Sequence, residues 1–142
     1  MIYMKPLFKM QTETTPYTSF DSKTKKFILS GRSIPDDAEE FYKPIINWVD
    51  AFSRLICDQA ELILNIDFLN ISSSKRLLYL LYKIKDMQSS GANVNVVWYF
   101  DPIDTDMLEI GKDYQSMVPE LKFEFIGHSE DSTFYKKILK VG

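Results

Sequence analysis

A chain of 142 residues with 45% hydrophobic and 26% charged side chains has the length and composition of one globular domain with a substantial core. Its formal net charge of −3 argues against a generic nucleic-acid binder, which needs a basic surface to neutralise phosphates. The single cysteine, Cys57, excludes an intramolecular disulfide and a cysteine-based metal site. The sequence also has no long apolar run for membrane insertion, so we expect a cytoplasmic protein.

The first elements in chain order are two short strands at 17–20 and 25–30, which a polar turn joins as a hairpin. Residues 31–37 contain glycine and proline and are expected to interrupt this pattern. From Ala38 onward, apolar residues recur at three- and four-residue steps, which predicts a helix. Pro44 either lies in the first full turn of that helix or kinks it.

Strands and helices then alternate along the rest of the chain. The pattern predicts a central strand at 61–69, a helix at 73–90, a strand at 94–100, a helix at 104–118 and a strand at 121–125. The first of these strands is apolar enough to be buried on both faces. No internal repeat or low-complexity segment interrupts the series.

The order ββαβαβαβ predicts an α/β fold. We expect a single domain with a mixed, mostly parallel sheet, an N-terminal hairpin and three main helices, because each crossover packs its helix back on the sheet. The expected division is an N-terminal extension at 1–16, the domain at 17–127 and a C-terminal extension at 128–142. A short helix around residues 134–139 is a further expectation.

Carboxylates gather after the strand at 94–100. Asp101, Asp104 and Asp106 could supply oxygen ligands to magnesium or calcium. Alternatively they are helix-starting carboxylates on a turn, because the spacing lacks the glycine and the distal glutamate of an EF-hand loop. His128, the single histidine, is expected on the surface, and we expect no cofactor and no catalytic group.

Three consecutive serines, at 72–74, stand where the central strand gives way to a helix. Backbone N–H groups lack partners at such a junction, and the helix dipole is positive there. One interpretation is that a serine caps the helix, which contributes about 1 kcal/mol. The other is a phosphorylation switch, because a phosphate with a charge of about −1.5 to −2 would lie near Lys75 and Arg76. Both interpretations remain open at this point.

Motifs spread over residues 17–126 are together similar to those of one family. They are Gly31-x-Ser33-x-Pro35, then Phe41-Tyr42-x-Pro44 and Trp48, Leu69-Asn70 with Ser72-Ser73 and Lys75, Val97-Trp98-Tyr99-x-Asp101, and Glu109-x-Gly111-x-Asp113. The chain resembles the SiaC family of regulatory phosphoproteins, whose STAS-like domain is related to anti-sigma factor antagonists. The resemblance implies a non-enzymatic bacterial switch protein that a Ser/Thr kinase phosphorylates and a PP2C-like phosphatase dephosphorylates. In its unmodified form it would bind an effector such as a diguanylate cyclase and favour biofilm growth.

The phosphoacceptor of this family is a threonine directly after the asparagine, and Ile71 occupies that position here. Isoleucine has no hydroxyl, so either Ser72 has taken over the role or the chain is locked in its unmodified form. The resemblance implies a partner-binding surface at Asn70, Ile71, Ser72, Ser73, Ser74, Lys75, Tyr99 and Asp101. Two alternatives lie outside the family: a metal-dependent enzyme or ion-binding domain using the three aspartates, and a constitutive dimerisation module.

Overall fold

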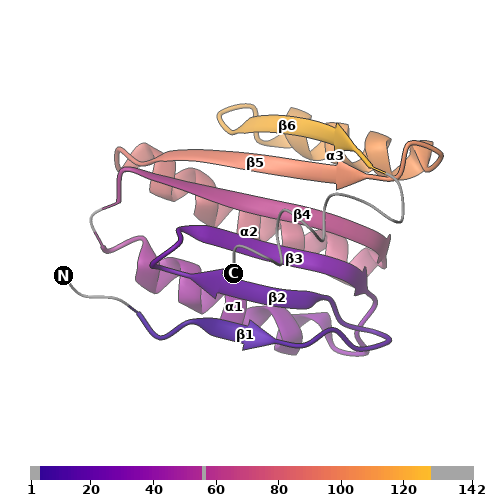
Figure 1. Cartoon of the computed structure of the whole chain (residues 1–142), viewed down its shortest axis with the longest axis horizontal. Helices are drawn as coiled ribbons and strands as arrows, with labels where there is room; N and C mark the ends of the chain where they lie inside the picture. Colours follow the sequence, from indigo (N-terminus) through magenta and orange to yellow (C-terminus); the bar gives the residue numbers. More distant parts are fainter. Residues whose placement is uncertain (1–3, 56, 129–142) are drawn as a thin grey trace.

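One mixed sheet organises the molecule, which we describe from a computed structural model over residues 4–55 and 57–128. The strands lie in chain order across the sheet: β1 (Leu7–Lys9), β2 (Tyr17–Asp21), β3 (Lys26–Ser33), β4 (Gln59–Leu69), β5 (Asn93–Phe100) and β6 (Lys122–Gly127). The pairs β1–β2 and β2–β3 are antiparallel, and β3 to β6 are mutually parallel (Figure 1). The predicted order ββαβαβαβ is confirmed from β2 onward. β1 is an additional edge strand within residues 1–16, and the helix predicted at 134–139 lies outside the described residues.

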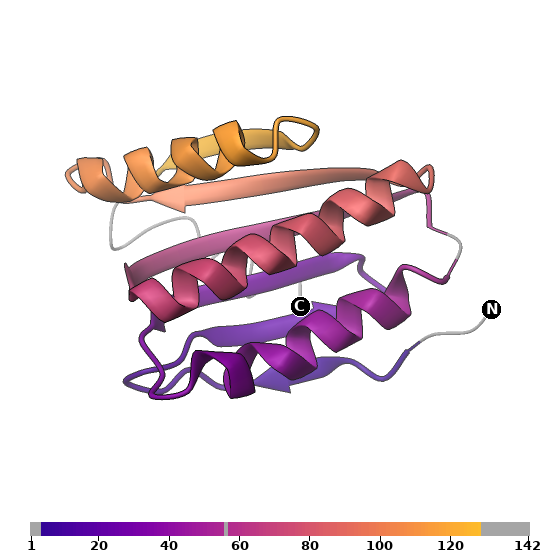
Figure 2. The same cartoon turned by 180° about the vertical axis from the view of Figure 1, so that it is seen from behind.

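Three helices cover one face of this sheet: α1 (Ala38–Phe52), α2 (Ile71–Ser89) and α3 (Thr105–Met117). Figure 2 shows them lying side by side in front of the strands. Each helix follows a parallel strand, so its N-terminus lies at the edge where β3, β4 and β5 end. Within the described part of the chain, no helix is long and apolar enough to span a membrane.

Local capping explains where α1 and α3 begin. Asp37 Oδ1 accepts a hydrogen bond from the backbone N–H of Glu40 at 3.0 Å, and Asp104 Oδ1 accepts one from Met107 at 3.1 Å. The carboxylates also complement the positive end of the helix dipole. Pro44 lies inside α1, past its first turn, where it removes the N–H that the carbonyl of Glu40 would otherwise bind.

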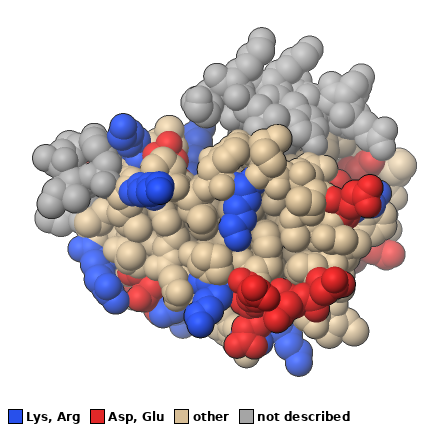
Figure 3. Space-filling model, turned by 90° about the horizontal axis from the view of Figure 1, so that it is seen from below, with Lys and Arg blue, Asp and Glu red and all other residues tan. Residues whose placement is uncertain are grey.

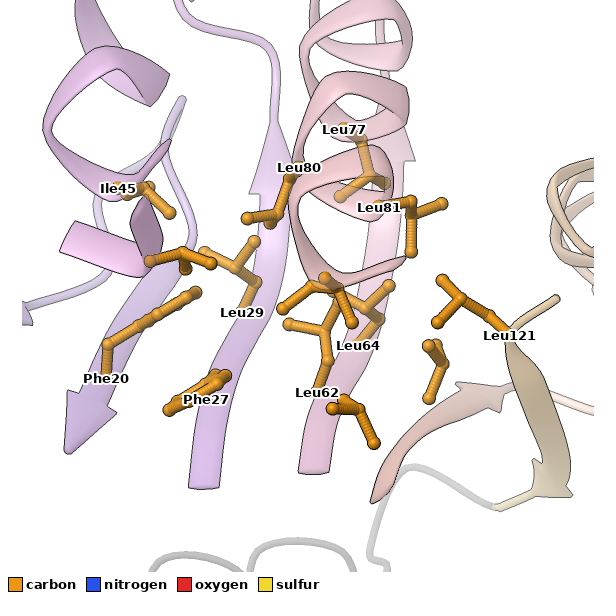
Figure 4. Packing of buried hydrophobic residues seen from close by; sticks show 14 of the residues in the cluster. Phe20, Phe27, Leu29, Ile45, Leu62, Leu64, Leu77, Leu80, Leu81 and Leu121 are labelled. Atoms are coloured by element: carbon orange, nitrogen blue, oxygen red, sulfur yellow. The ribbon is translucent and has the colours of Figure 1, made fainter. Parts of the chain in front are cut away.

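The main core lies between the three helices and the sheet. Figure 4 shows strand side chains such as Leu29 and Leu64 pointing toward the helices that carry Ile45 and Leu80. These residues have at most 2% of their surface exposed. A fully buried side chain of this size contributes about 1.5–3 kcal/mol, so the core holds α2 firmly over β4.

A smaller cluster lies on the helix-free face of the sheet, where Ile28, Ile63 and Val97 are buried. The central strand β4 is therefore buried on both faces around Ile63, as predicted. The prediction fails at the end of the strand, where Asp67 and Phe68 are exposed. This end of β4 leads directly into residues 70–75, which we call the serine segment.

Residues 31–33 continue β3 rather than interrupting it, so the predicted break is wrong. The strand register shifts between Gly31 and Arg32, and Gly31 has φ +123°, a conformation that side-chain-bearing residues rarely adopt. Because the strand continues through this bulge, Ser33 is fully buried at its end. Ser33 thereby comes next to the beginning of α2.

Candidate functional site

Asn70 caps α2. Its backbone is extended, with φ −83° and ψ 169°, and its Oδ1 accepts a hydrogen bond from the backbone N–H of Ser73 at 2.8 Å. Two further bonds hold Asn70 in place, since its backbone N–H donates to Ser33 O at 3.1 Å and its Nδ2 donates to Pro35 O at 3.4 Å. Of the two interpretations of the serines, the one in which a serine caps this helix is therefore wrong, and α2 begins at Ile71 rather than at Ser73.

The three serines of the first turn have different environments. Ser73 is fully buried, and Ser74 is half-buried with its Oγ donating to Ile71 O at 2.7 Å. Ser72 is exposed, and its hydroxyl has no hydrogen-bond partner among the described residues. Of these serines, Ser72 therefore offers the hydroxyl that a modifying enzyme can reach without disturbing a contact.

A buried chain of hydroxyls anchors this turn to the rest of the domain. Ser33 Oγ donates to Ser73 Oγ at 3.0 Å, so its other contact, at 2.6 Å, is a bond donated by Tyr42 OH. Burial raises the pKa of Tyr42 to about 12, although the hydrogen bond with Ser33 lowers it, so the phenol remains neutral. On the other side of α2, Tyr114 OH donates to Ser74 O at 2.8 Å. The beginning of α2 is thus tied to β3, α1 and α3.

Apolar side chains surround this anchored turn on the surface. Ile71 is 80% exposed, Phe68 at the end of β4 is 56% exposed and Ile103 after β5 is 88% exposed. All three lie at the edge of the sheet where the parallel strands end. Exposed apolar residues at one edge are typical of surfaces that another protein covers.

A hollow of about 570 Å³ opens at the same edge between the ends of β4 and β5. Its lining residues are Arg32, Asn65, Ile66, Asp67, Phe68, Asp101, Ile103, Asp104, Met107 and His128. Although the Asp67 side chain is exposed, the walls of the hollow partly remove its carboxyl from water, which raises its pKa, and the nearby charges of His128 and Arg32 partly offset this rise. His128 is half-buried, with Nε2 at 2.8 Å from Asn65 Oδ1, so it is less exposed than the sequence indicated.

The aspartates of this region hold the backbone. Asp101 Oδ1 accepts a hydrogen bond from the N–H of Ile103 at 3.1 Å, Asp104 caps α3, and Asp106 is exposed in the first turn of that helix. No group of three potential ligands that could hold a metal ion occurs among the described residues. The geometry therefore agrees with helix-starting carboxylates on a turn and gives no support to a metal site.

Tyr99 lies apart from the serine segment. It packs against the cluster on the helix-free face, and its ring centroid lies 5.9 Å from that of His128. Burial raises the pKa of Tyr99, as do Glu124 and Glu61. Asp101 lies at the same sheet edge as residues 70–75, whereas Tyr99 is on the face opposite α2. A role for either residue in partner binding stays a prediction.

Replacement of Asn70 by alanine is expected to lower the free energy of unfolding by about 1–2 kcal/mol, because the variant loses the cap of α2. The matched variant Asn70→Asp keeps an acceptor oxygen at this position and is expected to lose less than half as much. Urea unfolding followed by tryptophan fluorescence measures both. Equal losses in the two variants would mean that the Oδ1 contact to Ser73 is not what stabilises the turn.

Comparison with known proteins agrees with this architecture. An uncharacterised protein of Pseudomonas aeruginosa (strain UCBPP-PA14) is 25% identical over 104 residues, which cover 73% of this chain and 82% of that protein. The crystal structure of apo-SiaC from P. aeruginosa has the same fold, with a TM-score of 0.82 and 23% identity over 87% of this chain and 100% of the other. So does SiaC in the crystal structure of the diguanylate cyclase SiaD in complex with its activator SiaC. There the TM-score is 0.81 and the identity 24%, over 86% of this chain and 99% of the other.

The fold and these likenesses define the class of structure, a small α/β domain. A family model described as "SiaC family regulatory phosphoprotein" matches residues 10–128. The chain belongs to the SiaC family.

Proposed function

We propose that this protein is a non-enzymatic signalling switch, controlled by phosphorylation of Ser72 by a partner Ser/Thr kinase. A PP2C-like phosphatase reverses the modification, and the unmodified form binds an effector such as a diguanylate cyclase. The single observation that carries this proposal is the exposed hydroxyl of Ser72, which has no hydrogen-bond partner within residues 4–55 and 57–128. It lies next to the family's phosphoacceptor position, which Ile71 fills. Because the chain belongs to a family of regulatory phosphoproteins, phosphorylation is the modification that we expect at this hydroxyl.

The surface around Ser72 supports a role in partner binding. Ile71 and the other exposed apolar side chains of this edge give an effector hydrophobic area to cover. Transfer of the γ-phosphoryl group of ATP forms an O–P bond at Ser72 Oγ and releases ADP and a proton. The added charge of about −2 would have to lose its water in such an apolar contact, so modification weakens binding.

Incubation with the partner kinase and ATP is expected to add about 80 Da, the mass of one phosphate, to the wild-type chain. The Ser72→Ala variant should gain no mass. Ser74→Ala is the matched control, because it removes a neighbouring hydroxyl that is half-buried and already bonded to Ile71 O. Equal gain of mass in Ser72→Ala and in the wild type would remove Ser72 from the proposal.

Effector binding provides the second measurement. Calorimetry with the purified effector should give an affinity at least about tenfold weaker for the phosphorylated chain, equivalent to about 1.4 kcal/mol. Ile71→Thr returns a hydroxyl to the family position and should create a second site of modification. Unchanged affinity after stoichiometric phosphorylation would contradict control of this effector by phosphorylation.

A further inference from the structure

Ser72 lies on the side of α2 that faces α1. On that side Arg76 Nη2 is 3.6 Å from Glu39 Oε2, and Lys83 Nζ is 3.1 Å from Asp50 Oδ1. Residues four apart in a helix are neighbours on one side, which places Ser72 one turn before Arg76. Figure 2 shows α1 and α2 running next to each other along the sheet. A group attached to Ser72 Oγ is therefore directed toward the boundary between the two helices.

Ile71 projects in a different direction. Successive helical residues are rotated by about 100°, so the neighbour of Ile71 one turn later is Lys75 rather than Arg76. Lys75 is exposed and has no ion-pair partner among the described residues. Ser72 lies three residues before Lys75 and four before Arg76, so moving the modified hydroxyl from position 71 to position 72 brings Arg76 within reach of a phosphate in addition to Lys75.

Arg76 is already positioned for such a contact. Its side chain is 31% exposed, and the guanidinium lies over the ring of Tyr79, 5.3 Å from the centroid. Its present partner, Glu39, has a side chain that is 72% exposed, and an ion pair so open to water contributes little to stability. A phosphate accepts two parallel hydrogen bonds from a guanidinium and is the stronger partner.

We propose that Arg76 is the phosphate-binding residue of this protein: it releases Glu39 and binds the phosphate monoester on Ser72. This inference rests on the proposed modification of Ser72. The exchange opens the ion pair between α1 and α2 and frees the carboxylate of Glu39. Exposed carboxylates already surround the start of α1, because Asp36 and Asp37 directly precede the helix and Glu39 and Glu40 lie in its first turn. Figure 3 shows acidic side chains gathered at the lower right of its view. The modified state would thus present a strongly negative surface on both helices.

The test uses the full chain with phosphoserine incorporated genetically at position 72. Titration followed by phosphorus NMR reports the second pKa of the phosphate, which is about 6 without neighbours. Arg76→Gln is expected to raise this pKa by roughly 0.5 unit, because the nearby cation that favours the dianion is lost. Glu39→Gln is expected to lower it, since the competing carboxylate is removed.

Two matched variants make the outcome specific. Lys75→Gln removes the same charge one residue earlier and is expected to shift the pKa by less than half as much as Arg76→Gln. Arg76→Lys keeps the positive charge and is expected to raise the phosphate pKa by less than Arg76→Gln does. An unchanged pKa in Arg76→Gln, or an equal shift in Lys75→Gln, would overturn the assignment of Arg76. Because phosphoserine is incorporated without a kinase, this result is independent of whether a kinase modifies Ser72, which the mass measurement decides separately.

Discussion

Ser73→Asp is expected to lower the free energy of unfolding by roughly 3–5 kcal/mol, whereas Ser72→Asp should change it by no more than about 0.5 kcal/mol. Ser73 is fully buried, and its Oγ accepts a bond from Ser33 Oγ at 3.0 Å. A carboxylate there would lose its water among neutral hydroxyls. At Ser72 the same carboxylate remains in solvent at the positive end of the helix dipole.

Urea unfolding followed by tryptophan fluorescence distinguishes the two variants, because Trp48 and Trp98 are buried. Ser73→Ala is the control for loss of the hydroxyl alone and should cost about 1 kcal/mol. Equal stability of the two aspartate variants would contradict the buried position of Ser73. It would also remove the structural reason for preferring Ser72 as the phosphoacceptor.

Gly111→Ala is expected to destabilise the protein by roughly 1–3 kcal/mol or more, through overpacking. A Cβ atom at position 111 would lie 2.6 Å from Trp98 Nε1 and 2.7 Å from Trp98 Cε2. The indole cannot move aside easily, because Trp98 is fully buried and its Nε1 donates to Met107 O at 3.2 Å. Thermal and urea unfolding measure the loss.

Gly127→Ala is the matched control for this prediction. Its added Cβ would approach no atom closer than 3.3 Å, the nearest being Pro102 Cγ, and Gly127 is exposed. The control is expected to cost less than about 1 kcal/mol. If both alanine variants were equally stable, the close approach of α3 to β5 at Gly111 would not be what requires glycine there.

The order of strands and helices could be predicted because it depends on local periodicity. Alternating apolar residues in the strands, apolar residues at three- and four-residue steps in the helices, and the glycine and proline signals between them indicated every element from β2 to β6. β1 was missed, since a strand of three residues shows no periodicity. The break expected after Ser30 failed because a bulge at Gly31 keeps the strand paired with β4.

The candidate site could be predicted only in part. The serine segment was located correctly at a strand-to-helix junction, but three adjacent hydroxyls gave no means of choosing the cap. Asn70 is the cap because its backbone is extended, with ψ 169°. That conformation is held by hydrogen bonds from Asn70 to Ser33 O and Pro35 O. Ser73 likewise contacts Ser33 of β3, about 40 positions earlier in the chain, and Ser33 in turn is hydrogen-bonded to Tyr42 of α1. Only the folded chain brings these groups together.

The hydrogen bonds of Ser33, Tyr42 and Ser73 also bear on the way a signal would be transmitted. They hold the first turn of α2 in place on its buried side, while the side chains of Ile71 and Ser72 are exposed to solvent. Modification of Ser72 would leave this framework intact. A partner protein would therefore encounter nearly the same backbone in both states and would discriminate between them by charge rather than by shape.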